Sequence, residues 1–236
     1  MNRPLGFART LGTVAIALFA VALVHPDASA FNLRVPQIAF NNASLQGYLN
    51  ANDGGINTLT DQLDAQVWTS SVSGNASFTL MIELAGNASQ NAIGIYNPTA
   101  PPNPPLFQVF PGVASAGWHA SAHFGGGNLV VTLFDNNAII QGQTFYAGVN
   151  PNAFGFYLQG PGGTFYSQDA RNPGGAAYAL TYAGTGQNFG DWWECFEDLP
   201  PGSNDLDYDD AVLLLQSVVP TPVGSRTWGA LKSLYR

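Results

Sequence analysis

Short apolar runs recur along the chain, and clusters of residues that favour turns separate them. The runs cover 78–84, 106–110, 129–134, 154–158, 177–182 and 211–219. Gly, Pro, Asn and Asp dominate the separators, as at 160–163 and 172–175. Many short strands at this spacing are typical of a sandwich or jelly roll. We therefore predict an all-β fold: a single-domain β-sandwich or jelly-roll-like structure with little helix.

A helix is expected in one place only. The segment from Gly55 to Val67, GINTLTDQLDAQV, has a helical pattern but is short. No linker and no convincing internal repeat divides the chain. We therefore place one β domain at 31–219.

The first 30 residues have the pattern of a secretion signal. Arg3 and Arg9 precede an apolar run at 11–24, and the small-residue triplet at 28–30 matches a cleavage site. The run is too short for a stable membrane span, so we expect cleavage after Ala30 and no transmembrane segment in the mature chain. An uncleaved N-terminal anchor is the less favoured alternative. The pattern therefore predicts a secreted protein.

The last residues, 220–236, form a predicted C-terminal tail with a different composition. Arg226, Lys232 and Arg236 are basic in a chain that is otherwise poor in bases. Apolar side chains in the tail have helix-like spacing, at Trp228, Leu231, Leu234 and Tyr235. Composition does not separate a sorting or attachment tail from a helix that packs on the domain.

The charge of the chain is negative and concentrated in one segment. The formal net charge is −8, and eight of the 15 acidic residues lie within 191–210. A chain this acidic binds nucleic acid poorly, and anionic membrane surfaces repel it. The eight acids are Asp191, Glu194, Glu197, Asp198, Asp205, Asp207, Asp209 and Asp210.

No Lys or Arg occurs between Arg171 and Arg226 to neutralise these acids. Like charges at close range raise each other's pKa and destabilise the fold. The acids therefore stay apart in water, stay partly protonated, or surround a hard cation. Ca²⁺ takes six to eight oxygen ligands, mostly carboxylates, carbonyls and water. Because apolar residues flank the acids, we favour the cation over a solvated acidic face.

The spacing of the acids argues against an EF-hand. Asp210 stands where the sixth loop position needs Gly, and Gln216 stands where the twelfth needs Glu. In an extended chain the alternate acids share one side but lie 6–7 Å apart, so a turn or bulge is needed to gather them. We predict six metal ligands, with Asp191 and Glu194 outside the site: Glu197, Asp198, Asp205, Asp207, Asp209 and Asp210.

These residues also resemble a known family. The segment 171–219 reads as an Asn-Pro-x-Gly turn, an apolar strand, Phe-Glu-Asp-Leu from Phe196, a Gly-containing turn, and Asp-x-Asp-Tyr-x-Asp from Asp205. This order resembles DUF4114, a bacterial extracellular domain, although Asp209 stands where Asn is usual. Upstream segments are also similar to secreted members of that family. The resemblance implies a β-sandwich-like extracellular module with a divalent-cation site, and it implies no enzyme activity.

Relatives of this kind often end in a PEP-CTERM sorting signal. The stretch from Val219 to Pro222 is reminiscent of its first part, but the Glu and the apolar helix are missing. The resemblance therefore implies a surface or matrix location without that sorting route.

Other candidate chemistry is weaker. The single cysteine, Cys195, lies among aromatic and acidic residues, which is typical of a buried apolar side chain and not of a nucleophile. His119 and His123 share one face but have no third ligand nearby in the sequence. No nucleophile–base constellation can be assembled, so we predict that the protein is not an enzyme. Five aromatic side chains have the shape to stack on sugar rings, although in β proteins most such residues lie in the core or on a sheet face: Trp118, Tyr157, Tyr166, Trp192 and Trp193.

The leading hypothesis is a secreted, Ca²⁺-binding structural or adhesive protein of the bacterial cell surface or extracellular matrix. Its expected partners are extracellular polysaccharide or further copies of itself. A Ca²⁺-dependent carbohydrate-binding module is the alternative. A glycoside hydrolase ranks lowest, because the acids are too crowded to single out a catalytic pair.

Overall fold

The computed structural model describes residues 45–82 and 88–221. Residues 1–30 and 31–236 form two separate units, and every described residue belongs to the second. The predicted signal segment lies outside the described residues. So does the predicted tail, except for Pro220 and Thr221, which belong to the last strand.

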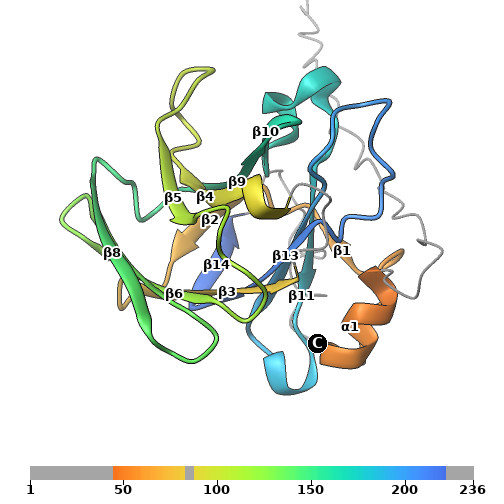
Figure 1. The fold of residues 1–236 in the computed structure, drawn as a ribbon, viewed down its shortest axis with the longest axis horizontal. Coiled ribbons are helices and arrows are strands. Elements are labelled where there is room, and N and C mark those ends of the chain that lie inside the picture. Colours follow the sequence, from red (N-terminus) through yellow and green to blue (C-terminus); the bar gives the residue numbers. More distant parts are fainter. Residues whose placement is uncertain (1–44, 83–87, 222–236) are drawn as a thin grey trace, which may run out of the picture. The chain divides into compact units, whose positions relative to one another are not determined.

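Eight strands form the larger sheet, in the order β1-β11-β12-β13-β3-β6-β7-β8 (Figure 1). Every neighbouring pair in it is antiparallel. In chain order these strands are β1 (Gln62–Leu63), β3 (Asn75–Ile82), β6 (His119–Gly125), β7 (Asn128–Phe134), β8 (Ile140–Ala147), β11 (Ala179–Ala183), β12 (Trp192–Phe196) and β13 (Ala211–Gln216).

A smaller sheet and a two-stranded ribbon complete the β structure. The smaller sheet has the order β10-β9-β4-β5, and the ribbon pairs β14 with β2. Their strands are β2 (Val67–Ser70), β4 (Ala92–Tyr96), β5 (Leu106–Phe110), β9 (Gly155–Gly160), β10 (Gly163–Tyr166) and β14 (Val218–Thr221). The described residues also contain one α-helix, α1 (Leu45–Asp53), and four 3-10 turns: η1 (Ala88–Gln90), η2 (Asp169–Arg171), η3 (Pro173–Gly175) and η4 (Gly186–Asn188).

The main core contains buried side chains from both sheets. Along β6 and β7 buried residues alternate with more exposed ones, the period of a strand with one buried face. Phe78 of the larger sheet meets Phe156 of the smaller one edge to face, with ring centroids 5.4 Å apart. Each fully buried aromatic side chain contributes roughly 1.5–3 kcal/mol through the hydrophobic effect. The prediction of an all-β sandwich with little helix is confirmed.

A second core lies on the other face of β11, β12 and β13. Leu45 and Leu49, four residues apart on α1, are fully buried and belong to the same cluster as Cys195 and Val212. Because neighbouring residues in a strand point to opposite faces, Trp193 joins this cluster while Trp192 packs against the main core. The strand β12 is therefore covered on both faces.

The helix prediction at 55–67 is wrong. That segment contains turns, β1 and the start of β2. The Asn57 side chain accepts the Leu59 N–H at 2.9 Å, and the Asp61 side chain accepts the Asn57 N–H at 2.7 Å. Short polar side chains that bond to nearby backbone in this way favour turns over helix. The helix lies earlier, at 45–53.

The predicted run 211–219 is two strands rather than one. Ser217 has a φ of 59°, and this left-handed residue separates β13 from β14. The two strands therefore belong to different sheets. As for membranes, the described part of the chain contains no helix with the length and apolar character needed to span one.

Candidate metal centre

The acidic segment connects β12 to β13, which are hydrogen-bonded neighbours within the larger sheet. Phe196, the last residue of β12, is paired with Ala211, the first of β13. Glu197 directly follows the one strand, and Asp210 directly precedes the other. The strand register alone therefore brings acids from both ends of the connection together.

Two left-handed residues gather the acids of the connection. Leu206 has a φ of 59° and Tyr208 a φ of 55°. Each such residue costs about 1–2 kcal/mol when it is not Gly. Tyr208 is buried in the second core and Leu206 packs against it, which offsets part of that cost. The backbone therefore turns at every second residue. Asp205 and Asp207, which would lie about 6–7 Å apart in a straight strand, have carboxylate oxygens within 4.8 Å of each other.

The carboxyl groups form two triads. In one, Glu197, Asp198 and Asp210 each offer an oxygen atom, and these atoms lie within 4.8 Å of one another. In the other, Glu197 combines with Asp205 and Asp207 under the same limit. Glu197 belongs to both triads, so it is the centre of the cluster.

Glu197 is fully buried, yet its carboxylate is only half bonded. The Leu206 N–H donates to its Oε2 at 3.0 Å, while its Oε1 has no hydrogen-bond partner. Asp209, which is 4% exposed, likewise has an unpartnered Oδ2. Leaving a buried polar atom unbonded costs about 1–3 kcal/mol, and more for a charged group. Both atoms therefore lack the hydrogen-bond partner that a buried oxygen normally has.

The pKa values of the cluster reflect this crowding. Burial raises the pKa of Glu197 to about 8, and the charges of Asp210, Asp205 and Asp207 add to the effect. Burial and the charge of Asp207 raise the pKa of Asp209 to about 8. Without a cation, these groups hold protons near neutral pH.

Two more acids are affected in the same way. The pKa of Asp210 rises to about 7 through burial and the charge of Asp198, although the Asp198 N–H donates to its Oδ2 at 2.8 Å. Burial is also the main cause that raises the pKa of Asp207. Protons and a metal ion would therefore compete for these carboxylates.

The six predicted ligands are not equivalent. Five of them make up the two triads, whereas Asp209 belongs to neither. Its backbone N–H donates to Asp207 Oδ1 at 3.3 Å. Asp191 and Glu194 also lie outside the triads: Asp191 accepts from the side chain of Gln216 at 2.9 Å, and Glu194 is buried in the sheet, where it accepts from Thr181 Oγ1 at 2.6 Å.

Asn91 is a site residue that sequence reasoning missed. It is 1% exposed, its Nδ2 donates to Asp198 Oδ2 at 2.8 Å, and its Oδ1 has no partner. The residue comes from the smaller sheet's side of the sandwich, 107 positions before Asp198. Its only signal in the sequence is a polar residue directly before the apolar run that becomes β4.

The described residues contain one Lys or Arg, Arg171, and it is not a partner of the cluster. Its guanidinium donates to the carbonyls of Pro98, Ala100 and Pro101 at 2.6–3.2 Å. It also lies 5.2 Å from the centre of the Tyr96 ring. This arginine therefore holds the proline-rich loop against the smaller sheet, and within the described part of the chain the acids have no basic counterpart.

The remaining candidate residues have structural surroundings. Cys195 is fully buried, and burial raises the pKa of its thiol well above the usual range. His119 stacks on Phe134 with ring centroids 4.7 Å apart, and His123 Nδ1 pairs with Asn75 Oδ1 at 2.7 Å. Neither histidine belongs to a metal-binding group within the described residues.

Among the five aromatic side chains considered for sugar stacking, Tyr157, Tyr166 and Trp193 are buried. Trp118 and Trp192 pack against the main core but are partly exposed. Of these five positions, the two tryptophans are the ones that still offer surface to a sugar.

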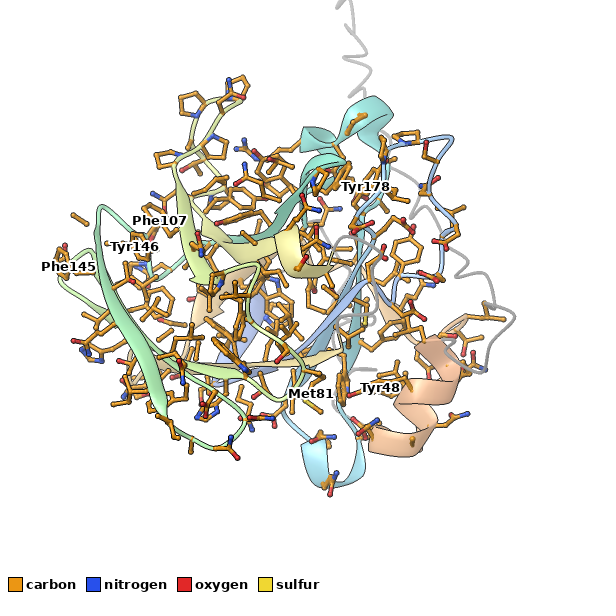
Figure 2. All side chains as sticks on the ribbon, in the orientation of Figure 1. Tyr48, Met81, Phe107, Phe145, Tyr146 and Tyr178 are labelled. Carbon is orange, nitrogen blue, oxygen red and sulfur yellow. The ribbon has the colours of Figure 1, made fainter. Side chains whose placement is uncertain are left out.

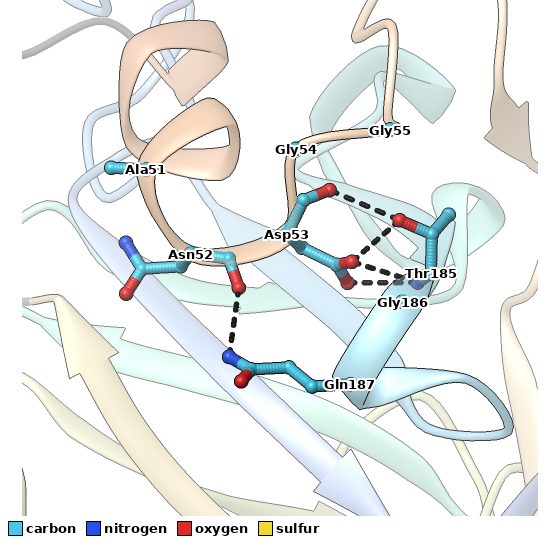
Figure 3. Close-up of a pocket in the computed structure, with 8 residues that line it drawn as sticks. All are labelled: Ala51, Asn52, Asp53, Gly54, Gly55, Thr185, Gly186 and Gln187. Carbon is cyan, nitrogen blue, oxygen red and sulfur yellow. Dashed lines mark hydrogen bonds between the residues drawn. The ribbon is translucent and has the colours of Figure 1, made fainter.

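A shallow hollow of about 420 Å³ lies between the end of α1 and η4 (Figure 3). Asp53 is the charged residue that lines it. Its carboxylate accepts the Thr185 N–H at 2.9 Å, the Thr185 hydroxyl at 2.6 Å and Trp193 Nε1 at 2.7 Å. These bonds lower its pKa against the opposing effect of burial. Because these donors occupy the Asp53 carboxylate and connect α1 to the sheet, we interpret the hollow as part of a structural contact.

Comparisons with known proteins name no family. No family model matches the chain, and no curated protein matches it. A solved structure of a congerin II double mutant has 11% sequence identity, with 69% of this chain and 97% of that chain covered, at a TM-score of 0.19. A likeness this low carries no argument about function.

Proposed function

We propose that this protein is a secreted structural or adhesive protein whose fold is stabilised by Ca²⁺ at the acid cluster. The observation that carries the proposal is Glu197: a fully buried carboxylate, shared by two oxygen triads, with an unpartnered Oε1. A cation placed there would satisfy an atom that the folded chain leaves unbonded.

The chemistry of the donors favours a hard cation. Both triads offer carboxylate oxygens and neither includes His or Cys, which soft and borderline metals prefer. Ca²⁺ accepts six to eight oxygens in flexible geometry, whereas Mg²⁺ requires a near-ideal octahedron. Five triad carboxylates on an irregular loop, with Asp205 exposed to solvent, suit Ca²⁺ with some water ligands.

Such an ion would connect the end of β12 to the start of β13, which are neighbours in the larger sheet. The predicted signal segment and the resemblance of 171–219 to DUF4114 support an extracellular setting, where sites with dissociation constants of 10⁻⁴–10⁻³ M are filled. The role is structural, since the cluster's acids are drawn together and not separated around a substrate.

Thermal unfolding in millimolar CaCl₂ and in chelator tests the proposal. We expect a higher midpoint in CaCl₂, and MgCl₂ at the same concentration should raise it less. Asp191→Asn is the matched control, because Asp191 lies in the same segment but outside both triads. Equal midpoints of the wild-type chain in CaCl₂ and chelator would refute the proposal.

A further inference from the structure

Within the described residues, one edge of the larger sheet has no neighbouring strand. β8 is its terminal strand, and seven of its eight residues are exposed, with Tyr146 partly so. A terminal strand presents unpaired N–H and C=O groups that can pair with another strand. In Figures 1 and 2, β8 lies at the margin of the sheet, and the labelled Phe145 points away from the molecule.

The terminal strands at three other sheet edges in the described part of the chain are short or have backbone groups bonded to side chains. β1, at the opposite end of the larger sheet, has two residues. In β10 the backbone N–H and C=O of Tyr166 bond to the Asn172 side chain. In β5 the carbonyl of Gln108 accepts from the Tyr146 hydroxyl at 2.9 Å. Of these edges, β8 is the long open one.

The usual protection of an edge strand is almost absent from β8. Charged residues, Pro and bulges normally prevent edge-to-edge pairing. β8 contains neither a charged residue nor Pro, and its pairing with β7 is irregular only near Ile140. Two of its residues, Ile140 and Phe145, are large, apolar and 63% exposed.

The surroundings of β8 are also uncharged. Between Leu84 and Gln168, Asp135 is the single residue of the Asp, Glu, Lys and Arg types. Copies of this chain share a net charge of −8 and repel one another. The region around β8 is where two copies can approach with the least repulsion. A strand can also pair with its own copy in antiparallel fashion about a two-fold axis, which gives a closed dimer.

We propose that the protein self-associates by antiparallel pairing of β8 with β8 of a second copy. The two larger sheets would then continue into one. All residues of β8 would lie at the seam, and Gln143 and Phe145 share one face of the sheet with their β7 partners Thr132 and Val130. Tyr146 points to the opposite side, where its ring meets Phe107 at 5.6 Å. A single pair of strands makes a small interface, so the dimer is weak and depends on concentration.

A charge-exchange experiment tests the pairing. One variant carries Gln143→Lys and Phe145→Lys, and the other carries Gln143→Glu and Phe145→Glu. Sedimentation velocity is measured from about 10 μM to about 1 mM, a range that captures weak dimers. We expect the wild-type chain to dimerise, each variant alone to dimerise at least tenfold more weakly, and an equimolar mixture of the two variants to recover dimerisation.

Phe189→Lys is the matched control, since Phe189 is 86% exposed and lies outside β8. Circular dichroism checks that each variant keeps the β fold. The proposal is overturned if the wild-type chain stays monomeric throughout, which would leave the edge to a different partner. It is equally overturned if Phe189→Lys weakens dimerisation as much as the β8 variants, or if the mixture does not recover it.

Discussion

Glu197→Gln should change stability in opposite directions with and without Ca²⁺. The substitution removes a charge but keeps the shape, and the new amide oxygen can still accept the Leu206 N–H that Oε2 accepts now. In chelator, the variant should be more stable than the wild type at pH 6, and by a larger margin at pH 9. The reason is that Glu197 keeps its proton in the native state up to a pKa of about 8 but loses it in the unfolded state near its usual value, so the wild type loses stability progressively as pH rises between the two.

In Ca²⁺ the same substitution should be harmful, because Glu197 is the one residue common to both triads. At about 10 mM CaCl₂, one hundred times a dissociation constant of about 10⁻⁴ M, the ion stabilises the native state by about 2.7 kcal/mol. For a domain of this size, 1 kcal/mol corresponds to about 2–4 °C, so the wild-type midpoint should rise by about 5–11 °C. The variant should lose most of that rise. Asp198→Asn, which affects one triad only, should lose less.

Differential scanning calorimetry at pH 6 and pH 9, in CaCl₂ and in chelator, measures all of these terms. Isothermal titration with CaCl₂ gives the affinity directly. A variant that keeps the full Ca²⁺-dependent rise would show that Glu197 is not a ligand. A variant less stable than the wild type in chelator at pH 9 would show that the buried charge of Glu197 does not destabilise the fold.

Three further outcomes follow from the structure. In chelator, the unfolding midpoint of the wild-type chain should fall as pH rises from 6 to 9. Acids with a raised native pKa stabilise the fold below their unfolded pKa, and that contribution is lost as pH rises through the native pKa values of about 7–8. Millimolar Ca²⁺ should flatten the fall, and a flat profile in chelator would contradict the pKa assignments. Gly160→Ala should destabilise by about 1–3 kcal/mol in urea unfolding, because the new Cβ would overlap Asn91 Oδ1, while Gly142→Ala, whose Cβ meets nothing within 4 Å, should not. Asp53→Ala should cost about 3 kcal/mol by the same assay because its buried donors lose their acceptor, and a loss below about 1 kcal/mol would show that the helix junction contributes little.

Much of the β structure was predictable because its signals are local. Alternating burial in β6 and β7 and the turn-forming residues between runs follow from the sequence with no knowledge of contacts. The helix was misplaced for a physical reason. Asn and Gly are weak helix formers, so α1 is held by burial of Leu45 and Leu49 against the sheet, a long-range effect.

The candidate site was predictable in its residues but not in its geometry. The density of acids marked the segment, and the absence of nearby bases indicated unneutralised charge. The left-handed residues Leu206 and Tyr208 could not be predicted, because the usual sequence signal for that conformation is Gly. The position of Asn91 depends on sandwich packing that joins residues 107 positions apart. The unequal place of Asp209 likewise appears only once the loop is folded.

The alternation of Trp192 and Trp193 on β12 gives each core its own optical reporter. Trp192 lies edge to face with Trp68 in the main core, at 5.8 Å between ring centroids, while Trp193 contacts Tyr48 beneath the helix at 6.3 Å. The difference in emission between the parent chain and a Trp193→Phe chain would therefore follow the helix side, and the difference between the parent chain and a Trp192→Phe chain would follow the space between the sheets. Two neighbouring residues thus allow the order in which the two cores loosen to be read by emission alone.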